Sequence, residues 1–241
     1  KGESDVYPFF SGEINYTFDN RWQAFFGSNL EDLATLDMTQ KLGARKQWDG
    51  VGVMGLSLLL SGIPGEVWED PYQLNVSRND TDRNSSGIQL DWYKILDSNF
   101  YLELNTRKID IDTERSGQQY CNDPDNNVAD PVSCLNLLRR DGDDSRLTVG
   151  YRWKNGDSYW EPEITVGQDD RDGDAISRDV MGLKLSYSYF GEVWTPVVSV
   201  AYVDYEYDQA NPVFGQRTDA DGFAASFSML RKLDMGDGNW S

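Results

Sequence analysis

The sequence contains no histidine in its 241 residues, and this absence excludes several chemistries. Histidine is the usual base of serine and cysteine hydrolases and the commonest zinc ligand. A pair of carboxylates could act without it, and Glu161 and Glu163 lie on one face of a predicted strand. Because Arg146 and Arg152 on the neighbouring strand can neutralise them, we expect cross-strand ion pairs there instead. The sequence therefore predicts a protein that is not an enzyme and that binds no cofactor.

Basic residues are scarce, since 22 Lys and Arg stand against 41 Asp and Glu, for a net charge of -19. Binding to a phosphate backbone needs a basic patch, so we expect no nucleic-acid partner. Much of the acidity lies in residues 111–144, which do not alternate as a strand would. We interpret this segment as a solvated acidic loop.

Long hydrophobic runs are also missing, the nearest being residues 51–60, so a membrane-spanning helix is not expected. The mean hydropathy of -0.62 suits a soluble protein. It suits a membrane barrel equally well, because barrel strands carry apolar residues only at alternate positions. An aromatic content of 13% argues against disorder.

Alternation of apolar and polar residues, bounded by turn residues, predicts an all-β protein. The predicted strands cover residues 8–18, 21–28, 34–45, 50–62, 85–95, 99–110, 145–153, 158–168, 179–190, 193–206 and 219–231, and a further strand begins near Trp240. No segment has a sustained helical period, although residues 135–140 could form a single helical turn.

Residues 147–167 show the pattern most clearly, as two alternating runs joined at Asn155-Gly156. Both residues tolerate the positive φ of a two-residue hairpin turn. One face of the hairpin is apolar and includes Val149 and Ile164. That face needs an apolar partner, which is a second sheet in a soluble sandwich and lipid in a membrane barrel.

The predicted connections alternate between short and long. The short ones are residues 19–20, 46–49, 96–98, 154–157, 190–192 and 232–239, and the long ones are 28–33, 62–84, 111–144, 169–178 and 207–218. In an up-and-down sheet, all the short turns then lie at one end, as in outer-membrane barrels. One strand before Lys1 and one after the strand at Trp240 would give an even fourteen, with twelve as the alternative.

The predicted fold is therefore an all-β, antiparallel, up-and-down transmembrane β-barrel, with about twelve strands in this chain and fourteen in the full protein. Residues 1–241 are expected to form a single outer-membrane β-barrel domain that is incomplete at both termini.

The two faces of the predicted strands differ in chemistry. The apolar face ends in aromatic residues close to the short turns, where a membrane interface would place them, at Trp22, Trp48, Trp92, Phe100, Trp153, Trp160, Tyr189 and Trp194. The polar face would line the lumen, and its candidate residues are Glu13, Asp37, Lys41, Arg45, Asp91, Glu103, Arg107, Arg146, Arg152, Glu161, Glu163 and Lys184. Mixed charge suits an ion-paired wall or a wet passage for small solutes.

Five runs of the sequence carry a family resemblance. They are SGEINYTF (residues 11–18), FFGSNLEDLATL (25–36), SGIPGEVWEDPY (61–72), DDRDGDAISRD (169–179) and YEYDQANPVFG (205–215). The chain resembles a proteobacterial outer-membrane β-barrel family catalogued as a domain of unknown function. The resemblance implies a location and a barrel with further strands near both ends, but no activity and no site residues.

Two cysteines, Cys121 and Cys134, lie in the long polar segment. We expect a disulfide between them, which fits the periplasm or the cell surface. Free buried thiols are the alternative, but so polar a loop offers little burial.

Alternating carboxylates around Gly173 resemble the start of a calcium loop. The terminal bidentate Glu of such loops is missing, so a solvated turn is the stronger interpretation and a weak calcium site the lesser one. The candidate ligands are Asp169, Asp170, Asp172 and Asp174.

The predicted function is a channel or uptake pore for small molecules in the outer membrane of a Gram-negative bacterium, with the long loops extracellular. The disulfide-tied segment 111–144 would gate the lumen or fold inward. The alternative is a non-conducting barrel whose acidic extracellular loops bind a ligand or partner, and a soluble β-sandwich or lectin is a third possibility. Outer-membrane lipid and a small solute are the expected partners, and no protein partner is identified.

Overall fold

The computed structural model describes residues 12–32 and 37–231, which form strands, two short α-helices and two 3₁₀ helices, η1 (Ile95–Asp97) and η2 (Pro124–Asn126). The strands are β1 (Gly12–Thr17), β2 (Trp22–Asp32), β3 (Asp37–Trp48), β4 (Gly52–Ile63), β5 (Gly65–Trp68), β6 (Asp80–Tyr93), β7 (Phe100–Ile111), β8 (Gly142–Tyr151), β9 (Trp153–Asn155), β10 (Ser158–Arg171), β11 (Arg178–Tyr189), β12 (Trp194–Tyr207) and β13 (Ala220–Arg231). The α-helices are α1 (Gln118–Asn122) and α2 (Pro131–Asn136). The all-β prediction is confirmed.

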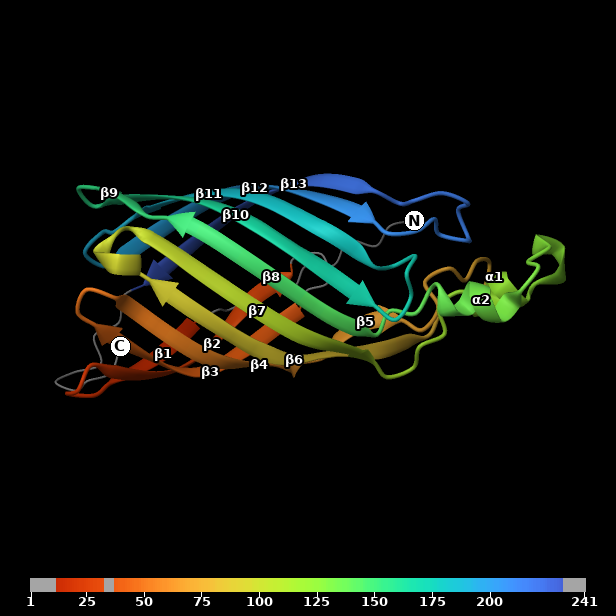
Figure 1. Ribbon diagram of the computed structural model, residues 1–241, viewed down its shortest axis with the longest axis horizontal. Helices are drawn as coiled ribbons and strands as arrows, with labels where there is room; N and C mark the ends of the chain where they lie inside the picture. Colours follow the sequence, from red (N-terminus) through yellow and green to blue (C-terminus); the bar gives the residue numbers. More distant parts are fainter. Residues whose placement is uncertain (1–11, 33–36, 232–241) are drawn as a thin grey trace.

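All described strands belong to one 13-stranded antiparallel sheet (Figure 1). Its main path is β1-β2-β3-β4-β6-β7-β8-β10-β11-β12-β13, with β5 paired to β6 and β9 to β10. A soluble sandwich would need a second sheet, and the described residues contain none. Within the same residues, no pairing joins β13 to β1.

The predicted strands match this order, with two differences besides the exact strand ends. β5 was missed because its Gly65–Trp68 run is too short to show alternation. The long connection predicted at residues 28–33 was wrong, since β2 continues to Asp32. The strand predicted near Trp240 lies outside the described residues.

Alternate side chains of this single sheet are buried and exposed. On β4, Leu56, Leu58 and Leu60 are 54%, 52% and 50% exposed, whereas Ser57 and Leu59 between them are 1% and 0% exposed. A flat single sheet would expose both faces, so the sheet must curve around the face that carries Ser57. We call that mainly polar face the inner face and the apolar one the outer face; Figure 1 shows the curved sheet with tilted strands.

The short connections lie at one end of the molecule and the long ones at the other (Figure 1). The turn between β9 and β10 is at the end opposite α1 and α2. No helix in the described part of the chain is long and apolar enough to cross a membrane.

The long connections pack against one another into what we call the loop cap, residues 69–79, 112–141, 172–177 and 208–219. Its centre is a cluster of buried side chains, namely Cys121, Cys134, Leu138 and Ala175. Backbone bonds tie segments together, as where Ala175 N donates to Leu137 O over 3.1 Å. The expectation of a loop with little burial was therefore wrong, because Cys121, Cys134 and Leu138 of one loop pack against Ala175 of another.

The cap also corrects the predicted position of a helical turn. The expected turn at residues 135–140 overlaps only the end of α2, which begins at Pro131. Asp130 caps it, since its carboxylate accepts hydrogen bonds from the amides of Val132 and Ser133. The hydrogen bond from the Ser133 hydroxyl is the main reason why the pKa of Asp130 is lowered.

Candidate functional site

The inner face of the sheet is the candidate site. The predicted lumen-lining residues occupy inner-face positions of β1, β3, β6, β7, β8, β10 and β11, and the register aligns them, as where Glu163 stands opposite Lys184 and Asp91 opposite Glu103. The side chain of Asp37, at the start of β3, lies outside the described part of the structure. The inner face thus carries three polar groups of residues, two toward the short-turn ends of the strands and one at the long-loop end.

The first group lies at the short-turn end and is centred on Arg45. Its Nη2 is 2.9 Å from Glu13 Oε1 and 2.8 Å from Asn15 Oδ1, and its guanidinium lies 5.0 Å from the centroid of the Phe25 ring. Arg45 and Gln23 line a pocket of about 520 Å³ that opens between β1, β2, β3 and β4. The pocket leaves room for water and small solutes at this end.

The second group pairs tyrosine phenols, near the short-turn ends of β6 and β7, with carboxylates. Tyr101 OH donates to Glu163 Oε1 over 2.6 Å, and Tyr93 OH donates to Glu103 Oε1. Lys184 Nζ approaches the other oxygen of Glu163 at 3.0 Å. The carboxylates of this group on the inner face therefore accept hydrogen bonds from phenols, and one of them also pairs with an ammonium group.

Nearer the short turns, Arg152 Nε donates to Glu161 Oε1 over 2.8 Å. The expected neutralisation of Glu161 and Glu163 by Arg146 and Arg152 is correct for the pair Arg152 with Glu161. Glu163 is instead paired with Lys184, because the register of β10 with β11 brings those two residues opposite each other.

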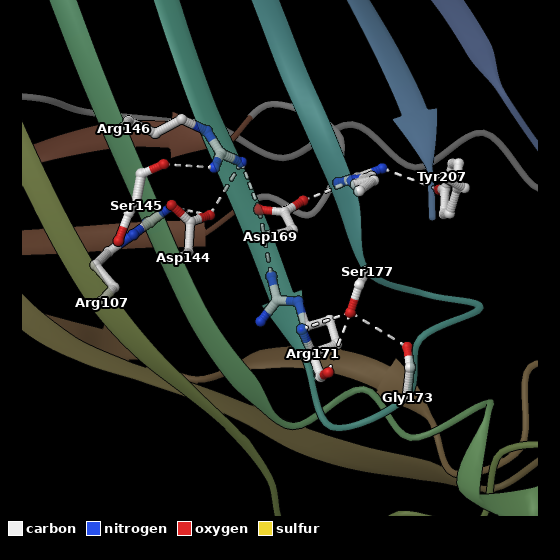
Figure 2. Close-up of polar contacts among 10 residues, drawn as sticks. Arg107, Asp144, Ser145, Arg146, Asp169, Arg171, Gly173, Ser177 and Tyr207 are labelled. Atoms are coloured by element: carbon white, nitrogen blue, oxygen red, sulfur yellow. Dashed lines mark hydrogen bonds and ion pairs between the residues drawn. The ribbon is translucent and has the colours of Figure 1, made fainter. Parts of the chain in front are cut away.

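The third group lies at the long-loop end, and we call it the arginine cluster: Arg107, Arg146, Arg171 and Arg178 with Asp144 and Asp169. Figure 2 shows Asp169 between Arg146 and Arg171. Asp169 is 1% exposed. Its Oδ1 is 2.5 Å from Arg146 Nη2 and 3.7 Å from Arg171 Nη2, and its Oδ2 is 2.5 Å from Arg178 Nε. One carboxylate is therefore shared by three guanidinium groups.

Asp144 has the same arrangement on a smaller scale. Its Oδ2 is 3.2 Å from Arg146 Nη2 and 3.4 Å from Arg107 Nη2. Arg146 therefore joins the two carboxylates into one network that spans β7, β8, β10 and β11.

The prediction from sequence missed part of this cluster. Asp144, Arg171 and Arg178 were placed in loops because the predicted strands 145–153 and 179–190 begin too late and the predicted strand 158–168 ends too early. Extending the alternation of β10 beyond residue 168 puts Asp169 and Arg171 on the face of Glu161 and Glu163. Strand length was the signal that could have found them.

The weak calcium candidate is not supported by this geometry. Asp169 is engaged by arginines, Asp172 Oδ2 is 3.3 Å from Arg139 Nη2, and Asp174 accepts a hydrogen bond from Gln209. Within the described residues, no group of three or more Asp, Glu, His or Cys side chains is placed to hold a metal ion. Asp169 and Asp170 face opposite sides because successive side chains of β10 alternate, and Asp172 and Asp174 lie beyond the strand in the loop cap.

The predicted disulfide is confirmed. Cys121 on α1 is bonded to Cys134 on α2, with Cα atoms 5.8 Å apart, inside the loop cap. The prediction that the segment would fold inward is wrong, because Figure 1 shows α1 and α2 projecting beyond the end of the sheet.

Comparisons with known proteins give a family but no activity. The family model described as "Protein of unknown function (DUF2860)" matches residues 1–241. No curated protein matches the chain. One similar solved structure is that of the outer-membrane expressed OmpT of Vibrio cholerae, with a TM-score of 0.49 and 10% identity over 92% of this chain. The chain spans 64% of the length of that protein.

Proposed function

The chain belongs to the DUF2860 family, and we propose that it is an outer-membrane β-barrel that passes small polar solutes through its interior. The proposal places the long loops outside the cell and the short turns in the periplasm. The proposal includes closure of the sheet into a barrel, with fourteen strands in the full protein. It includes no catalytic step.

The observation that carries the proposal is the exposure of apolar side chains on the outer face. Ile164, Val200 and Phe26 are 53%, 53% and 48% exposed, on strands far apart in the sheet. Contiguous apolar surface of this extent is unfavourable in water and suits contact with lipid.

Aromatic residues close to the short turns support the same orientation. Trp22, Trp48 and Trp194 are 39%, 38% and 49% exposed on the outer face. Lys46 Nζ lies 5.2 Å and 5.4 Å from the ring centroids of Trp22 and Trp48. Indole rings next to an ammonium group are typical of the boundary between lipid and water.

The inner face supports a passage for solutes rather than an apolar core. Its charged and hydroxyl side chains form a hydrated wall of both signs, and the 520 Å³ pocket at the short-turn end is lined by Arg45, Gln23 and Gln47. Such a wall suits small polar molecules and repels apolar ones.

Single-channel recording in planar lipid bilayers tests the proposal. The purified protein should give stepwise conductance, and Gly182→Phe, on the inner face, should lower it. Leu183→Phe, the next residue but on the outer face, should leave conductance unchanged. Absence of conductance and of solute flux into vesicles would contradict a pore.

A second candidate function is binding by the loop cap, favoured by its packed, disulfide-linked structure. Leu74, Val132 and Phe214 are 63%, 66% and 58% exposed on the cap, among many carboxylates. Replacing residues 118–136 with a Gly-Ser linker tests it, with lysozyme as a basic probe protein. Loss of lysozyme binding without a change in conductance would favour binding by the cap, and unchanged binding would oppose it.

A further inference from the structure

We propose that the arginine cluster binds the oxyanion group, a carboxylate, phosphate or sulfate, of a solute that enters the interior. The inference rests on the proposed function, because the inner face is reached by a solute only if the interior admits one. It assigns a class of ligand and a binding site to the inner face, whose charges are of both signs.

The first argument is the imbalance of charge around Asp169. Three guanidinium groups, from Arg146, Arg171 and Arg178, lie within 2.5 to 3.7 Å of its oxygens. Arg146 is shared further with Asp144. Within the described residues, Asp144 and Asp169 thus face more guanidinium groups than two carboxylates can neutralise, and burial makes an uncompensated charge costly. An added oxyanion would reduce the excess.

The second argument is an unsatisfied donor on Arg171. Its side chain is only 10% exposed, its Nη2 is 3.7 Å from Asp169, and its Nη1 is buried without a hydrogen-bond partner among the described residues. A buried donor without an acceptor costs about 1–3 kcal/mol. An oxyanion that accepts from Nη1 would remove this cost.

Nearby carboxylates of the loop cap do not supply that acceptor. Glu114 is bound by Arg140, with Nε to Oε2 at 2.9 Å, and Asp172 is paired with Arg139. Among described carboxylates, Asp169 is the one within ion-pair distance of Arg171. Glu114 and Asp172 are therefore engaged in ion pairs within the cap.

The third argument is the fixed orientation of the groups. The guanidinium of Arg178 lies 4.1 Å from the centroid of the Tyr205 ring, and its Nη1 donates to Tyr207 OH over 3.1 Å. The backbone amide of Arg171 donates to Ser177 Oγ over 2.9 Å, which holds the end of β10, as Figure 2 shows. Guanidinium groups held in place form the bidentate bonds that carboxylate and phosphate accept.

Inorganic phosphate is the probe for this site. In thermal unfolding of the detergent-solubilised protein at pH 7, potassium phosphate should raise the midpoint above that in potassium chloride of equal ionic strength. Arg171→Gln should weaken phosphate binding by about tenfold, measured by calorimetry. Lys108→Gln, at a similar level of the sheet but on the outer face, should leave it unchanged.

One further variant and the wild-type protein itself keep the test decisive. Arg171→Lys keeps the charge without the planar fork, so its phosphate affinity should lie between those of the wild type and Arg171→Gln. Should the Arg171 variants fail to fold, phosphate titration of the wild type still decides: binding at a site gives a saturable calorimetric isotherm, whereas the general stabilising effect of phosphate does not saturate. Equal midpoints in the two salts, or phosphate binding that Arg171→Gln leaves intact, would overturn the inference.

Failure of this inference and failure of the proposed function give different results. Conductance in bilayers without phosphate binding rejects the oxyanion site and leaves the pore. Phosphate binding that depends on Arg171, in a protein without conductance, supports the site and rejects the pore.

Discussion

The phenol of Tyr101 on β7 donates a 2.6 Å hydrogen bond to Glu163 on β10, across the strand that separates them. That strand, β8, places Gly150 opposite both residues in the register. The bond is possible because Gly150 has no side chain, so the Tyr101 ring lies over its Cα. An added Cβ at Gly150 would overlap the ring atoms of Tyr101.

Gly150→Ala should therefore destabilise the sheet by about 1–3 kcal/mol, because overpacking would displace Tyr101 from Glu163. Gly182→Ala is the matched control, since a Cβ there would lie 3.5 Å from its nearest neighbour, Thr165 Cβ. The measurement is the denaturant midpoint of heat-modifiable migration in gels. Equal midpoints for the two variants would contradict the role assigned to Gly150.

Ile164→Arg should lower stability by about 2–4 kcal/mol in lipid, because it puts a charge on the outer face midway along β10. Leu96→Arg is the control: Leu96 is 69% exposed, but it lies in a short turn beyond the strands. Folding titrations in lipid vesicles measure both variants. If Ile164→Arg is no more harmful than Leu96→Arg, the outer face does not meet lipid.

Reduction of the Cys121–Cys134 disulfide should open the loop cap without unfolding the sheet. On the chain-entropy model, a loop of this length is stabilised by about 3 kcal/mol. Trypsin should then cleave at Arg115 or Arg139 in the reduced protein, while heat-modifiable migration is unchanged. Equal resistance of reduced and oxidised protein to trypsin would show that packing alone holds the cap.

Tyr72 should make the stability of the cap depend on alkaline pH. Burial raises the pKa of its phenol, and this outweighs the hydrogen bond from Asn211 Nδ2, which is 2.9 Å from the phenol oxygen and lowers the pKa. Because the folded pKa is the higher one, stability is full below the unfolded value of about 10 and falls as pH rises through the folded value. Tyr72→Phe should remove this loss.

The pKa of the Tyr72 phenol can be measured directly. The phenolate absorbance of Tyr72→Phe is subtracted from that of the wild type at each pH. The difference curve should contain a single phenol that titrates above the ordinary pKa of tyrosine. A midpoint at or below the ordinary value would contradict the burial of Tyr72.

The strands and their faces could be predicted from the sequence because both are local properties. Alternation with a period of two fixes which side chains share a face, whatever the strand later pairs with. Asn155-Gly156 predicted one hairpin, although its turn residues are Gly156 and Asp157, since Asn155 pairs with Ser158. Its outer-face residues Val149 and Ile164 are exposed as expected, at 41% and 53%. The alternation of short and long connections could likewise be predicted from the sequence alone.

Partners within the site could not be predicted in the same way. Arg146 was assigned to the correct face, but its partners are Asp144 and Asp169 rather than Glu161 or Glu163, because pairing depends on strand register. A shift in register changes every cross-strand neighbour. The ends of strands, where alternation gives way to turns, concealed Arg171.

The sequence by itself determined an all-β chain with one apolar and one polar face and with its long connections at one end, since each follows from residue order. Only the tertiary structure decided that the polar face is the buried one and that three arginines share Asp169. It also brought Tyr72 to Asn211, 139 residues away. The physical reason is that curvature and register are properties of the whole sheet, set by hydrogen bonds between strands that are distant in the chain.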